Sequence, residues 1–317
     1  MSEIYANNKM IFSGLGGPLG YALNLVRDDS NAIGFRSSEC DLLNKKFTIN
    51  YFTNLVKSIN RGAGITYVHA AAKSGGSHLS EKIPASLFTE NIEMAINALE
   101  ACRISGIDRI ILILSTSCYS SSIANPSEVD LHKFPVETNE FGYSYAKRMF
   151  EVLMRAYNKQ YNMNISCVLV NGIIGSHMKF SDEHSILPAA LIKKFVTNKS
   201  NLNTVELWGD GTPLREYTYS MDLAKAILWC LKNQEKNTLL NIGNNQKISV
   251  KELSMIIADK IGINKERIGF NGQTSFGKQI QSTDNSLFVN LSGFTYSNIH
   301  LAIDEAINDF FLNWQKA

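Results

Sequence analysis

Short apolar runs rich in β-branched residues alternate with longer amphipathic stretches along the first 170 residues of the chain. The clearest amphipathic stretch runs from Ala146 to Tyr157 and repeats its apolar residues at the spacing of a core-facing helix. Strands that alternate with helices are typical of a parallel sheet covered on both faces. The predicted strands are Lys9–Ser13, Ala32–Phe35, Thr66–Ala70, Arg109–Leu114 and Ile165–Val170.

The regular alternation ends after Gly175, where polar loops separate isolated helices. The clearest of these helices are expected over Lys251–Ile261 and Leu301–Phe311. This change predicts a second, smaller lobe.

The composition is that of an ordinary soluble enzyme, with 317 residues of which 44% are hydrophobic and 19% are charged. A formal net charge of +2 gives no basic field that would favour nucleic acid or a membrane surface. The longest apolar runs are too short to span a bilayer, and the first nine residues lack the apolar stretch of a signal peptide. Five irregularly spaced cysteines predict neither a disulfide framework nor a metal site, so we expect a reducing cytoplasm.

The first predicted strand leads directly into a glycine-rich loop, in which Gly14, Gly17 and Gly20 are spaced by three. Glycines at such positions permit a tight turn and let backbone N–H groups approach a pyrophosphate at a helix N-terminus. Pro18 suits the first turn of the following helix. A glycine turn without a ligand is the alternative, but the flanking strand and helix favour a dinucleotide site in a Rossmann-type fold.

The residue after the second predicted strand is Arg36, where an NAD enzyme usually carries an acidic residue for the ribose 2′-hydroxyl. A guanidinium at this position attracts a 2′-phosphate and favours NADP(H) over NAD. A solvated surface arginine is the alternative interpretation.

Tyr143 and Lys147 lie four residues apart at the start of the amphipathic stretch, which places them on one helix face. A nearby ammonium favours the phenolate form of tyrosine and brings its pKa into catalytic range. Tyr143 can then protonate a ketone oxygen, and Lys147 can also hold the nicotinamide ribose. The spacing alone also occurs in ordinary surface pairs.

Three hydroxyl residues and a cysteine, Ser115 to Cys118, follow the strand Arg109–Leu114. The carboxyl edge of a parallel sheet is where ligands bind, so we expect one of these hydroxyls to orient the same ketone oxygen.

The glycine loop, the hydroxyl-bearing strand end and the Tyr/Lys helix together resemble the extended short-chain dehydrogenase/reductase family. Residues 69–76 (HAAAKSGG) and 208–217 (WGDGTPLREY) narrow the similarity to the epimerase–reductases that act on GDP-linked 4-keto-deoxysugars. The similarity covers nearly the whole chain and includes residues 241–243 (NIG) and 250–253 (VKEL).

The resemblance implies a doubly wound parallel Rossmann-type α/β sheet with a smaller C-terminal α/β lobe that binds a nucleotide sugar. We expect the NADP-binding domain over residues 1–172, with a return segment at about 216–246. The lobe would then comprise residues 173–215 and 247–317.

The resemblance also assigns roles to individual residues. Thr116 matches the catalytic hydroxyl, Tyr143 the proton donor and Lys147 its partner, while Cys118 and His184 match the pair that epimerises C3 and C5. Ala71 is also predicted to bind the cofactor, together with the glycines, Arg36 and Lys147. The predicted substrate-binding residues are Ser117, Asn171, Lys193, Trp208, Arg215 and Lys278, with Arg215 on the nucleotide diphosphate.

Several positions depart from the family pattern. His184 is shifted by one residue relative to Pro188, so that His177 competes for its role, and Thr116 stands where serine is usual. Ser120-Ser121 replaces the common Tyr-Pro, and Asn171 comes one position early. These departures leave the reductase chemistry better supported than the epimerase chemistry.

The sequence therefore predicts a cytoplasmic enzyme that reduces C4 of a GDP-linked 4-keto-deoxysugar or heptose with NADPH, with or without prior C3/C5 epimerisation. The alternatives are a UDP- or dTDP-sugar epimerase or dehydratase of the same fold and a non-catalytic dinucleotide-binding protein. A homodimer is implied by the resemblance, through helices around Ile92–Cys102 and Tyr143–Tyr157. The sugar and the base are not fixed by the sequence.

Overall fold

The computed structural model describes residues 9–26, 32–59, 64–136, 140–181, 185–201, 203–233, 235–272 and 282–314. The predicted site residues His184 and Lys278 lie outside these ranges. Within the described ranges, no helix combines the length and the apolar character that crossing a bilayer would require.

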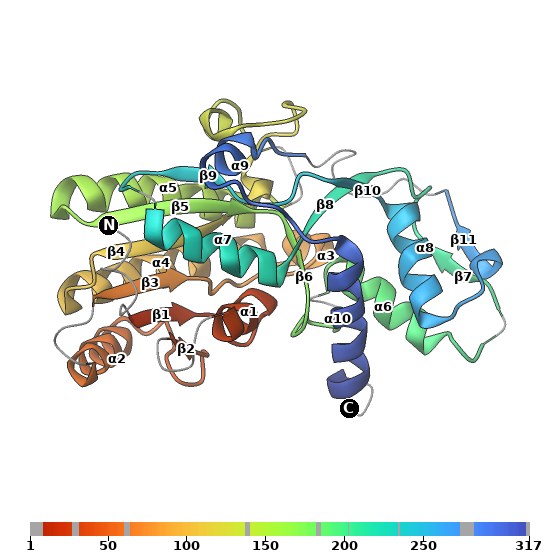
Figure 1. The fold of residues 1–317 in the computed structure, drawn as a ribbon, viewed down its shortest axis with the longest axis horizontal. Helices are drawn as coiled ribbons and strands as arrows, with labels where there is room; N and C mark the ends of the chain where they lie inside the picture. The colour runs from red at the N-terminus through yellow and green to blue at the C-terminus, as the bar shows by residue number, and fades with distance from the viewer. Residues whose placement is uncertain are drawn as a thin grey trace.

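A six-stranded parallel sheet forms the centre of the described chain, in the order β2-β1-β3-β4-β5-β9 (Figure 1). Its strands are β1 (Lys9–Ser13), β2 (Ala32–Phe35), β3 (Ile65–His69), β4 (Arg109–Ser115), β5 (Asn164–Val170) and β9 (Leu239–Asn241). The chain forms β2 on one side of β1 and then returns to form β3 on the other side, so the strand order reverses at β1. Ligands of such sheets bind at the carboxyl edge beside this reversal.

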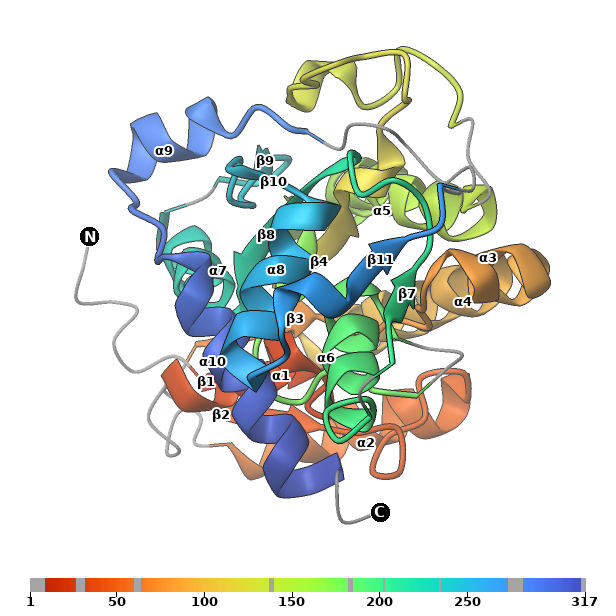
Figure 2. The same ribbon diagram turned by 90° about the vertical axis from the view of Figure 1, so that its right-hand side faces the viewer.

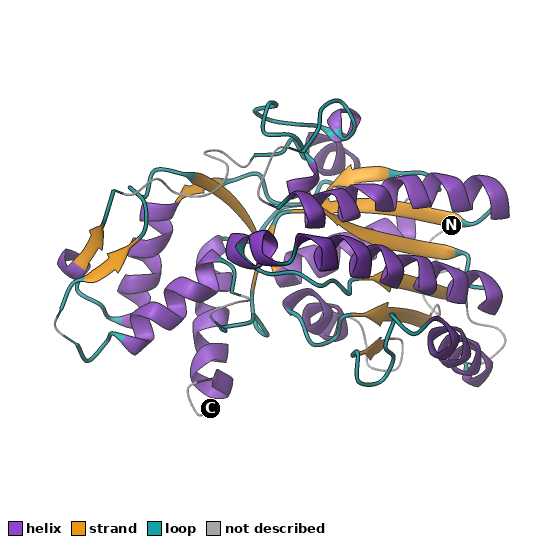
Figure 3. Ribbon diagram, turned by 180° about the vertical axis from the view of Figure 1, so that it is seen from behind, coloured by secondary structure: helices purple, strands orange, loops and turns teal. Residues whose placement is uncertain are grey.

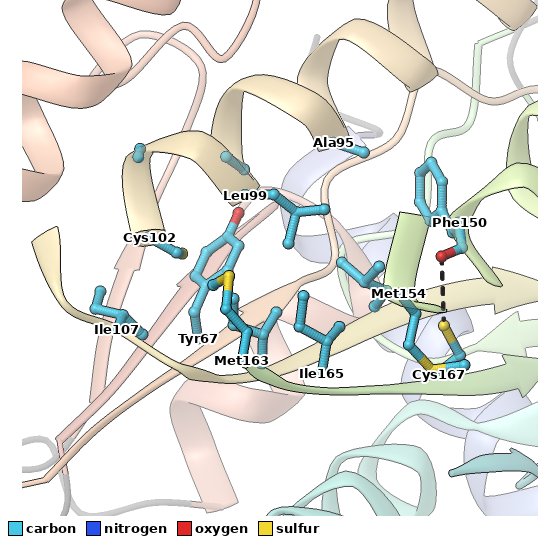
Figure 4. Packing of buried hydrophobic residues seen from close by; sticks show 14 of the residues in the cluster. Tyr67, Ala95, Leu99, Cys102, Ile107, Phe150, Met154, Met163, Ile165 and Cys167 are labelled. Atoms are coloured by element: carbon cyan, nitrogen blue, oxygen red, sulfur yellow. Dashed lines mark hydrogen bonds between the residues drawn. The ribbon is translucent and has the colours of Figure 1, made fainter. Parts of the chain in front are cut away.

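Helices cover both faces of the sheet. One face carries α2 (Lys45–Ser58), α4 (Pro84–Ser105) and α5 (Phe141–Tyr161), and the other carries α1 (Pro18–Val26), α7 (Ser220–Asn233) and α9 (Ser286–Ser292). Successive residues of β4 point to opposite faces, so Leu112 packs in the first core and Ile113 in the second. Figure 4 shows part of the first core, where the Cys167 thiol donates to the Phe150 carbonyl over 3.7 Å.

A third hydrophobic core lies beside the sheet, among elements that follow β5 in the chain (Figures 2 and 3). Two small sheets, β10-β8-β6 and β11-β7, pack there against three helices. Their bounds are β6 (Gly172–Ile174), α6 (Leu187–Thr197), β7 (Val205–Leu207), β8 (Leu214–Tyr219), β10 (Lys247–Ser249), α8 (Val250–Ile261), β11 (Ile268–Phe270) and α10 (Ile299–Asp309). The remaining elements are α3 (Ser77–Lys82) and the short helical turns η1 (Thr116–Cys118), η2 (Glu128–Asp130), η3 (Lys265–Arg267) and η4 (Phe310–Trp314).

The doubly wound sheet predicted from the sequence is confirmed. The strands β1 and β2 have the predicted bounds, and the other three predicted strands differ from them by one residue at one or both ends. Helix α9 packs on α7 through the rings of Phe288 and Trp229, whose centroids are 5.5 Å apart, although the sequence assigns residues 247–317 to the lobe. The division of the chain into two domains stays a prediction.

Candidate active site

The glycine loop joins β1 to α1 and crosses the end of β3 at close range. Gly14 has a φ of +82°, and a Cβ at this position would lie 2.9 Å from the backbone carbonyl of Ala70. A Cβ at Gly20 would lie 2.1 Å from the Gly14 oxygen. A Cβ at Gly17 would lie 3.7 Å from the same oxygen, which is an ordinary van der Waals distance. The loop therefore needs glycine at two positions for its own shape and leaves open space at the third, as a phosphate cradle requires.

Arg36 lies beside this loop, directly after β2. Its side chain is exposed, and its Nε would be 3.9 Å from a Cβ at Gly16. The guanidinium is thus placed to bind a phosphate on the ribose nearest β2. Ala71 lies on the opposite side of the loop, where its N–H donates to Ser13 Oγ over 3.1 Å. The predicted cofactor-binding residues are brought together at one edge.

The Tyr143/Lys147 pair lies in the first turns of α5, close to the end of β4. Lys147 is buried, and its Nζ donates to the Ile113 carbonyl over 2.9 Å and lies 4.5 Å from the centre of the Phe150 ring. Burial lowers the pKa of Lys147 to about 8. The neighbouring groups Cys118 and Cys167 oppose this decrease.

The pKa of Tyr143 differs in direction from the sequence prediction. Burial and the neighbouring groups Cys118 and Glu140 raise the pKa of this phenol, and a hydrogen bond with the Ser115 side chain opposes the rise. Desolvation, which disfavours the phenolate, outweighs the expected influence of the Lys147 ammonium. The resting phenol is therefore protonated, which is the form that donates a proton.

The hydroxyl side chains after β4 occupy different environments. Ser115 caps the η1 turn by accepting from the Ser117 N–H over 3.2 Å, and it is also the residue that contacts the Tyr143 phenol. Thr116 is half-buried at the start of that turn. The Ser117 hydroxyl oxygen is buried and has no hydrogen-bond partner among the described residues. The contact of Ser115 was missed from the sequence, because three hydroxyl residues in a row gave no basis for choosing the first.

Cys118 is buried between η1 and α5. Its thiol donates to the Ser144 carbonyl over 3.4 Å. Its own carbonyl accepts from Arg148, with a distance of 3.0 Å to Nε and a second, closer contact to Nη2. Arg148 also donates through Nη1 to the Phe134 carbonyl over 2.9 Å. This buried arginine, which the sequence did not single out, ties the hydroxyl-bearing turn to the helix that carries Tyr143 and Lys147.

His177, the alternative to His184 for the epimerisation role, lies away from the η1 turn that carries Cys118. Its ring stacks on Tyr21 of α1 with centroids 4.1 Å apart, and its N–H donates to Asp309 Oδ2 over 2.9 Å. These contacts tie His177 to α1 and α10, whereas Cys118 packs against α5.

The predicted substrate-binding residues of the lobe lie on separate elements. Arg215 is half-buried on β8, where Nη1 donates to the Leu214 carbonyl over 2.8 Å. Burial lowers the pKa of this guanidinium, and Tyr217 and Glu140 oppose the shift. Trp208 is 76% exposed after β7, and Lys193 is half-buried on α6.

Asn171 is engaged within the protein instead. Its Nδ2 donates to the Asn244 carbonyl over 2.7 Å, and its Oδ1 accepts from Thr218 Oγ1 over 2.6 Å. Its side chain also hydrogen-bonds to the buried carboxylate of Glu216. These contacts tie the junction between β5 and β6 to β8 and to Asn244, and a role of Asn171 in substrate binding stays a prediction.

Comparison with known proteins identifies the class to which this geometry belongs. Residues 22–243 match the NAD dependent epimerase/dehydratase family. The chain is 29% identical over 328 aligned positions to the GDP-L-fucose synthase of Dictyostelium discoideum, covering 100% of this chain and 99% of that protein.

Two solved structures share the fold. The GDP-L-fucose synthetase of Naegleria fowleri bound to NADP has a TM-score of 0.85 at 23% identity, with 98% of this chain and 96% of that chain covered. A GDP-6-OMe-4-keto-L-xylo-heptose reductase from C. jejuni has a TM-score of 0.84 at 20% identity, with 96% and 98% covered.

Proposed function

The chain belongs to the NAD dependent epimerase/dehydratase family, and we propose that it reduces C4 of a GDP-linked 4-keto-deoxysugar or heptose with NADPH. One observation carries this proposal: the half-buried Tyr143 and the buried cation Lys147 lie in the first turns of α5 at the carboxyl end of β4, two strands from the glycine loop of β1. A phenol beside an ammonium is suited to protonate the oxygen of a carbonyl that receives a hydride.

The residues present fit an NADP(H) cofactor. The open cradle at Gly17 and the N-terminus of α1 suit the pyrophosphate, and Arg36 suits the 2′-phosphate. Lys147 would hold the nicotinamide ribose. When bound, NADPH supplies the hydride that reaches C4. Tyr143 transfers its proton to the O4 oxygen, which completes the alcohol, and Thr116 orients that oxygen.

The nucleotide and sugar are proposed from the relatives, because the aligned proteins are named for GDP-L-fucose and for a GDP-4-keto-heptose. Arg215 on β8 is our candidate for the diphosphate, with Ser117, Lys193, Trp208 and Lys278 as further contacts.

The proposed reduction is tested by following NADPH absorbance with purified GDP-4-keto-6-deoxymannose. We expect turnover by the wild-type protein and a loss of roughly 10²- to 10⁴-fold in Tyr143→Phe, with NADPH affinity retained. Full activity of Tyr143→Phe would overturn the proposal. Tightly held NAD that copurifies, together with turnover of UDP- or dTDP-sugars and no NADPH consumption, would instead identify an epimerase or dehydratase.

We propose C3/C5 epimerisation before reduction as a second activity, favoured by the proximity of Cys118 to Tyr143. In this scheme Cys118 acts as the base and His184 as the acid at the carbons next to the ketone. Incorporation of solvent deuterium at C3 and C5 measures this step. We expect Cys118→Ser to abolish incorporation, and full incorporation by this variant would assign the exchange to other groups. No incorporation by the wild-type protein would mean that it is a reductase alone.

We further propose a homodimer in the cytoplasm that serves nucleotide-sugar supply for polysaccharide biosynthesis. Helices α4 and α5 pack side by side, and Phe88, Ile104 and Val152 on them are 38%, 50% and 40% exposed. The five cysteines are all buried and free, which suits a reducing compartment. Light scattering should give twice the chain mass, and Val152→Asp should shift it toward the monomer.

A further inference from the structure

The turn that follows β2 brings an acidic side chain back to the end of that strand. Glu39 lies in this turn, and its Oε2 accepts from the backbone N–H of Arg36 over 2.8 Å. The N–H groups of Glu39 and Cys40 both donate to the Arg36 carbonyl over 3.0 Å. These reciprocal contacts fix the Glu39 carboxylate beside the first residue after the strand, in the part of a Rossmann site that meets the ribose.

An acidic group at this place is what an NAD enzyme uses to bind the ribose 2′-hydroxyl. The residue directly after β2 is an arginine, so its position alone favours a 2′-phosphate. The fold adds the carboxylate of Glu39, three residues further along the chain, to the same strand end. A ribose bound there would therefore meet a cation and an anion together.

The residues around this ribose position carry little positive charge to offset Glu39. The Nε of Arg36 would lie 3.9 Å from a Cβ at Gly16, which places one cation beside the glycine loop. The loop itself, residues 14–20, contains no lysine or arginine. Residues 36–41 (RSSECD) contain one arginine and two acidic residues, and these three charged side chains are exposed. Acidic groups thus outnumber basic ones in the segment beside the ribose.

Resting on the NADP(H) site of the proposed function, we propose that Glu39 is a specificity-determining residue that limits the preference of this protein for NADPH over NADH. Its carboxylate repels the 2′-phosphate that Arg36 attracts. In NADH, which carries a hydroxyl at this position, the same carboxylate accepts the hydrogen of the 2′-hydroxyl. A carboxylate has about four lone-pair sites, so its bond to the Arg36 N–H leaves room for this second donor.

Two effects change the ratio of the two affinities in the same direction. Repulsion between an exposed carboxylate and a phosphate dianion weakens NADPH binding by roughly 3- to 10-fold at low salt. A hydrogen bond from the ribose hydroxyl to a carboxylate is charge-assisted and strengthens NADH binding. Because selectivity is the difference between two binding free energies, each effect lowers the preference for NADPH.

The test measures binding and does not depend on turnover. Isothermal calorimetry gives the dissociation constants of NADPH and NADH for the full-length protein, at low salt and at about 0.5 M KCl. Glu39→Gln keeps a side-chain oxygen for the Arg36 N–H and removes the charge. At low salt we expect this variant to bind NADPH roughly 3- to 10-fold more tightly than the wild type and NADH no more tightly. The gain for NADPH should shrink at high salt, because salt screens repulsion between exposed charges.

Matched variants separate the charge from the shape of the turn. Arg36→Gln should have the opposite effect, with NADPH affinity reduced roughly tenfold or more and NADH affinity nearly unchanged. Glu235→Gln removes an exposed carboxylate before β9, at the amino edge of the sheet, and should keep both dissociation constants. Melting temperatures are compared first, and if Glu39→Gln does not fold, Glu39→Ser, an uncharged residue with an acceptor oxygen, replaces it.

A ratio of NADPH to NADH affinity in Glu39→Gln equal to that of the wild type would overturn the inference. A change in the ratio that is the same at both salt concentrations would also overturn it, since the change would then come from the shape of the turn. Full activity of Tyr143→Phe would contradict the proposed reduction and leave a salt-dependent change in the ratio, and with it this inference, intact.

Discussion

At the scale of single residues, His69 shows how the core beneath the site fixes a protonation state. The Tyr67 hydroxyl donates to Ser13 Oγ over 3.0 Å, and its oxygen lies 3.0 Å from His69 Nδ1. Since the tyrosine hydrogen is already used, His69 Nδ1 carries the hydrogen of this second bond. His69 Nε2 then bears a lone pair that is buried without a partner among the described residues. Burial, helped by the charge of Lys147, lowers the pKa of His69 to about 3.

This pKa makes His69 a source of acid sensitivity. The imidazole of the unfolded chain binds a proton near pH 6.5, whereas that of the folded protein resists it until about pH 3. As the pH falls through this window the unfolded state gains protons, so the free energy of unfolding decreases, by up to ~5 kcal/mol from this group. In urea denaturation at pH 7, 6 and 5, His69→Gln should show a flatter decrease than the wild type.

The control for this prediction is His300→Gln, which changes an exposed histidine of α10 and should keep the wild-type slope. Equal slopes for His69→Gln and the wild type would show that His69 does not govern the acid response.

The sequence could predict site residues that are fixed by spacing, and it could not predict those fixed by contacts. The i, i+4 spacing placed Tyr143 and Lys147 on one helix face, and the strand end placed Arg36 beside the loop. Nothing in the sequence showed that Ser115 contacts the phenol or that Asn171 is engaged inside the protein. Both facts depend on neighbours that are distant in the chain.

At the scale of elements, the turn between β1 and α1 depends on backbone proximity. A methyl group on Gly14 would approach the Ala70 carbonyl to 2.9 Å at a positive φ, so Gly14→Ala should displace the loop. We expect the affinity for NADPH to fall at least tenfold and the protein to lose about 1–3 kcal/mol of stability. Isothermal calorimetry and urea denaturation measure the two effects.

Gly17→Ala is the matched variant, because its methyl group would meet protein only at 3.7 Å. It should keep the stability of the wild type and weaken NADPH binding by filling the cradle. A Gly14→Ala protein as stable as Gly17→Ala would contradict the close crossing of β3.

The contact between α5 and the η1 turn depends on Arg148. Three of its N–H groups donate to the carbonyls of Cys118 and Phe134, so Arg148→Met would remove these donors from one buried and one partly buried acceptor. We expect a loss of about 2–3 kcal/mol in the free energy of unfolding, measured in urea. Arg155→Met, which removes an exposed arginine from the same helix, should cost less than 1 kcal/mol. Similar losses of stability in the two variants would show that the contacts of Arg148 with the Cys118 and Phe134 carbonyls contribute little.

Elements that carry a strong pattern were predicted well, and short ones were not. The five predicted strands and α5 coincide with apolar residues at the spacing expected for a strand or a helix. In β4, for example, the neighbouring residues Leu112 and Ile113 pack into the cores on opposite faces of the sheet. The three-residue strands β6, β7, β9, β10 and β11 are too short to show a period, and their pairing is set by distant partners. The sixth strand of the main sheet was therefore not found from the sequence.

At the scale of the whole molecule, residues 282–285 connect the lobe to the sheet. Thr283 donates to the buried carboxylate of Glu216 on β8 through its N–H and its hydroxyl, over 3.1 and 3.0 Å. The adjacent Asp284 N–H donates to the Pro126 carbonyl over 3.0 Å, and Ser282 hydrogen-bonds to Asn125 over 2.7 Å. One short segment thus contacts both the strand that carries Arg215 and the loop that follows the Cys118 turn.

Thr283→Val tests this connection because valine keeps the shape of threonine and removes one donor to Glu216. Burial already raises the pKa of Glu216, and loss of the donor should raise it further, so the ionised carboxylate becomes more costly in the folded state. We expect a loss of about 1–3 kcal/mol in the free energy of unfolding at pH 8. The loss should shrink toward pH 5, where protonation of Glu216 relieves the missing donor.

Thr197→Val, at an exposed position of α6, should lose little at either pH. A Thr283→Val deficit that is equal at the two pH values would mean that the segment is held by its backbone contacts and not by the charge of Glu216.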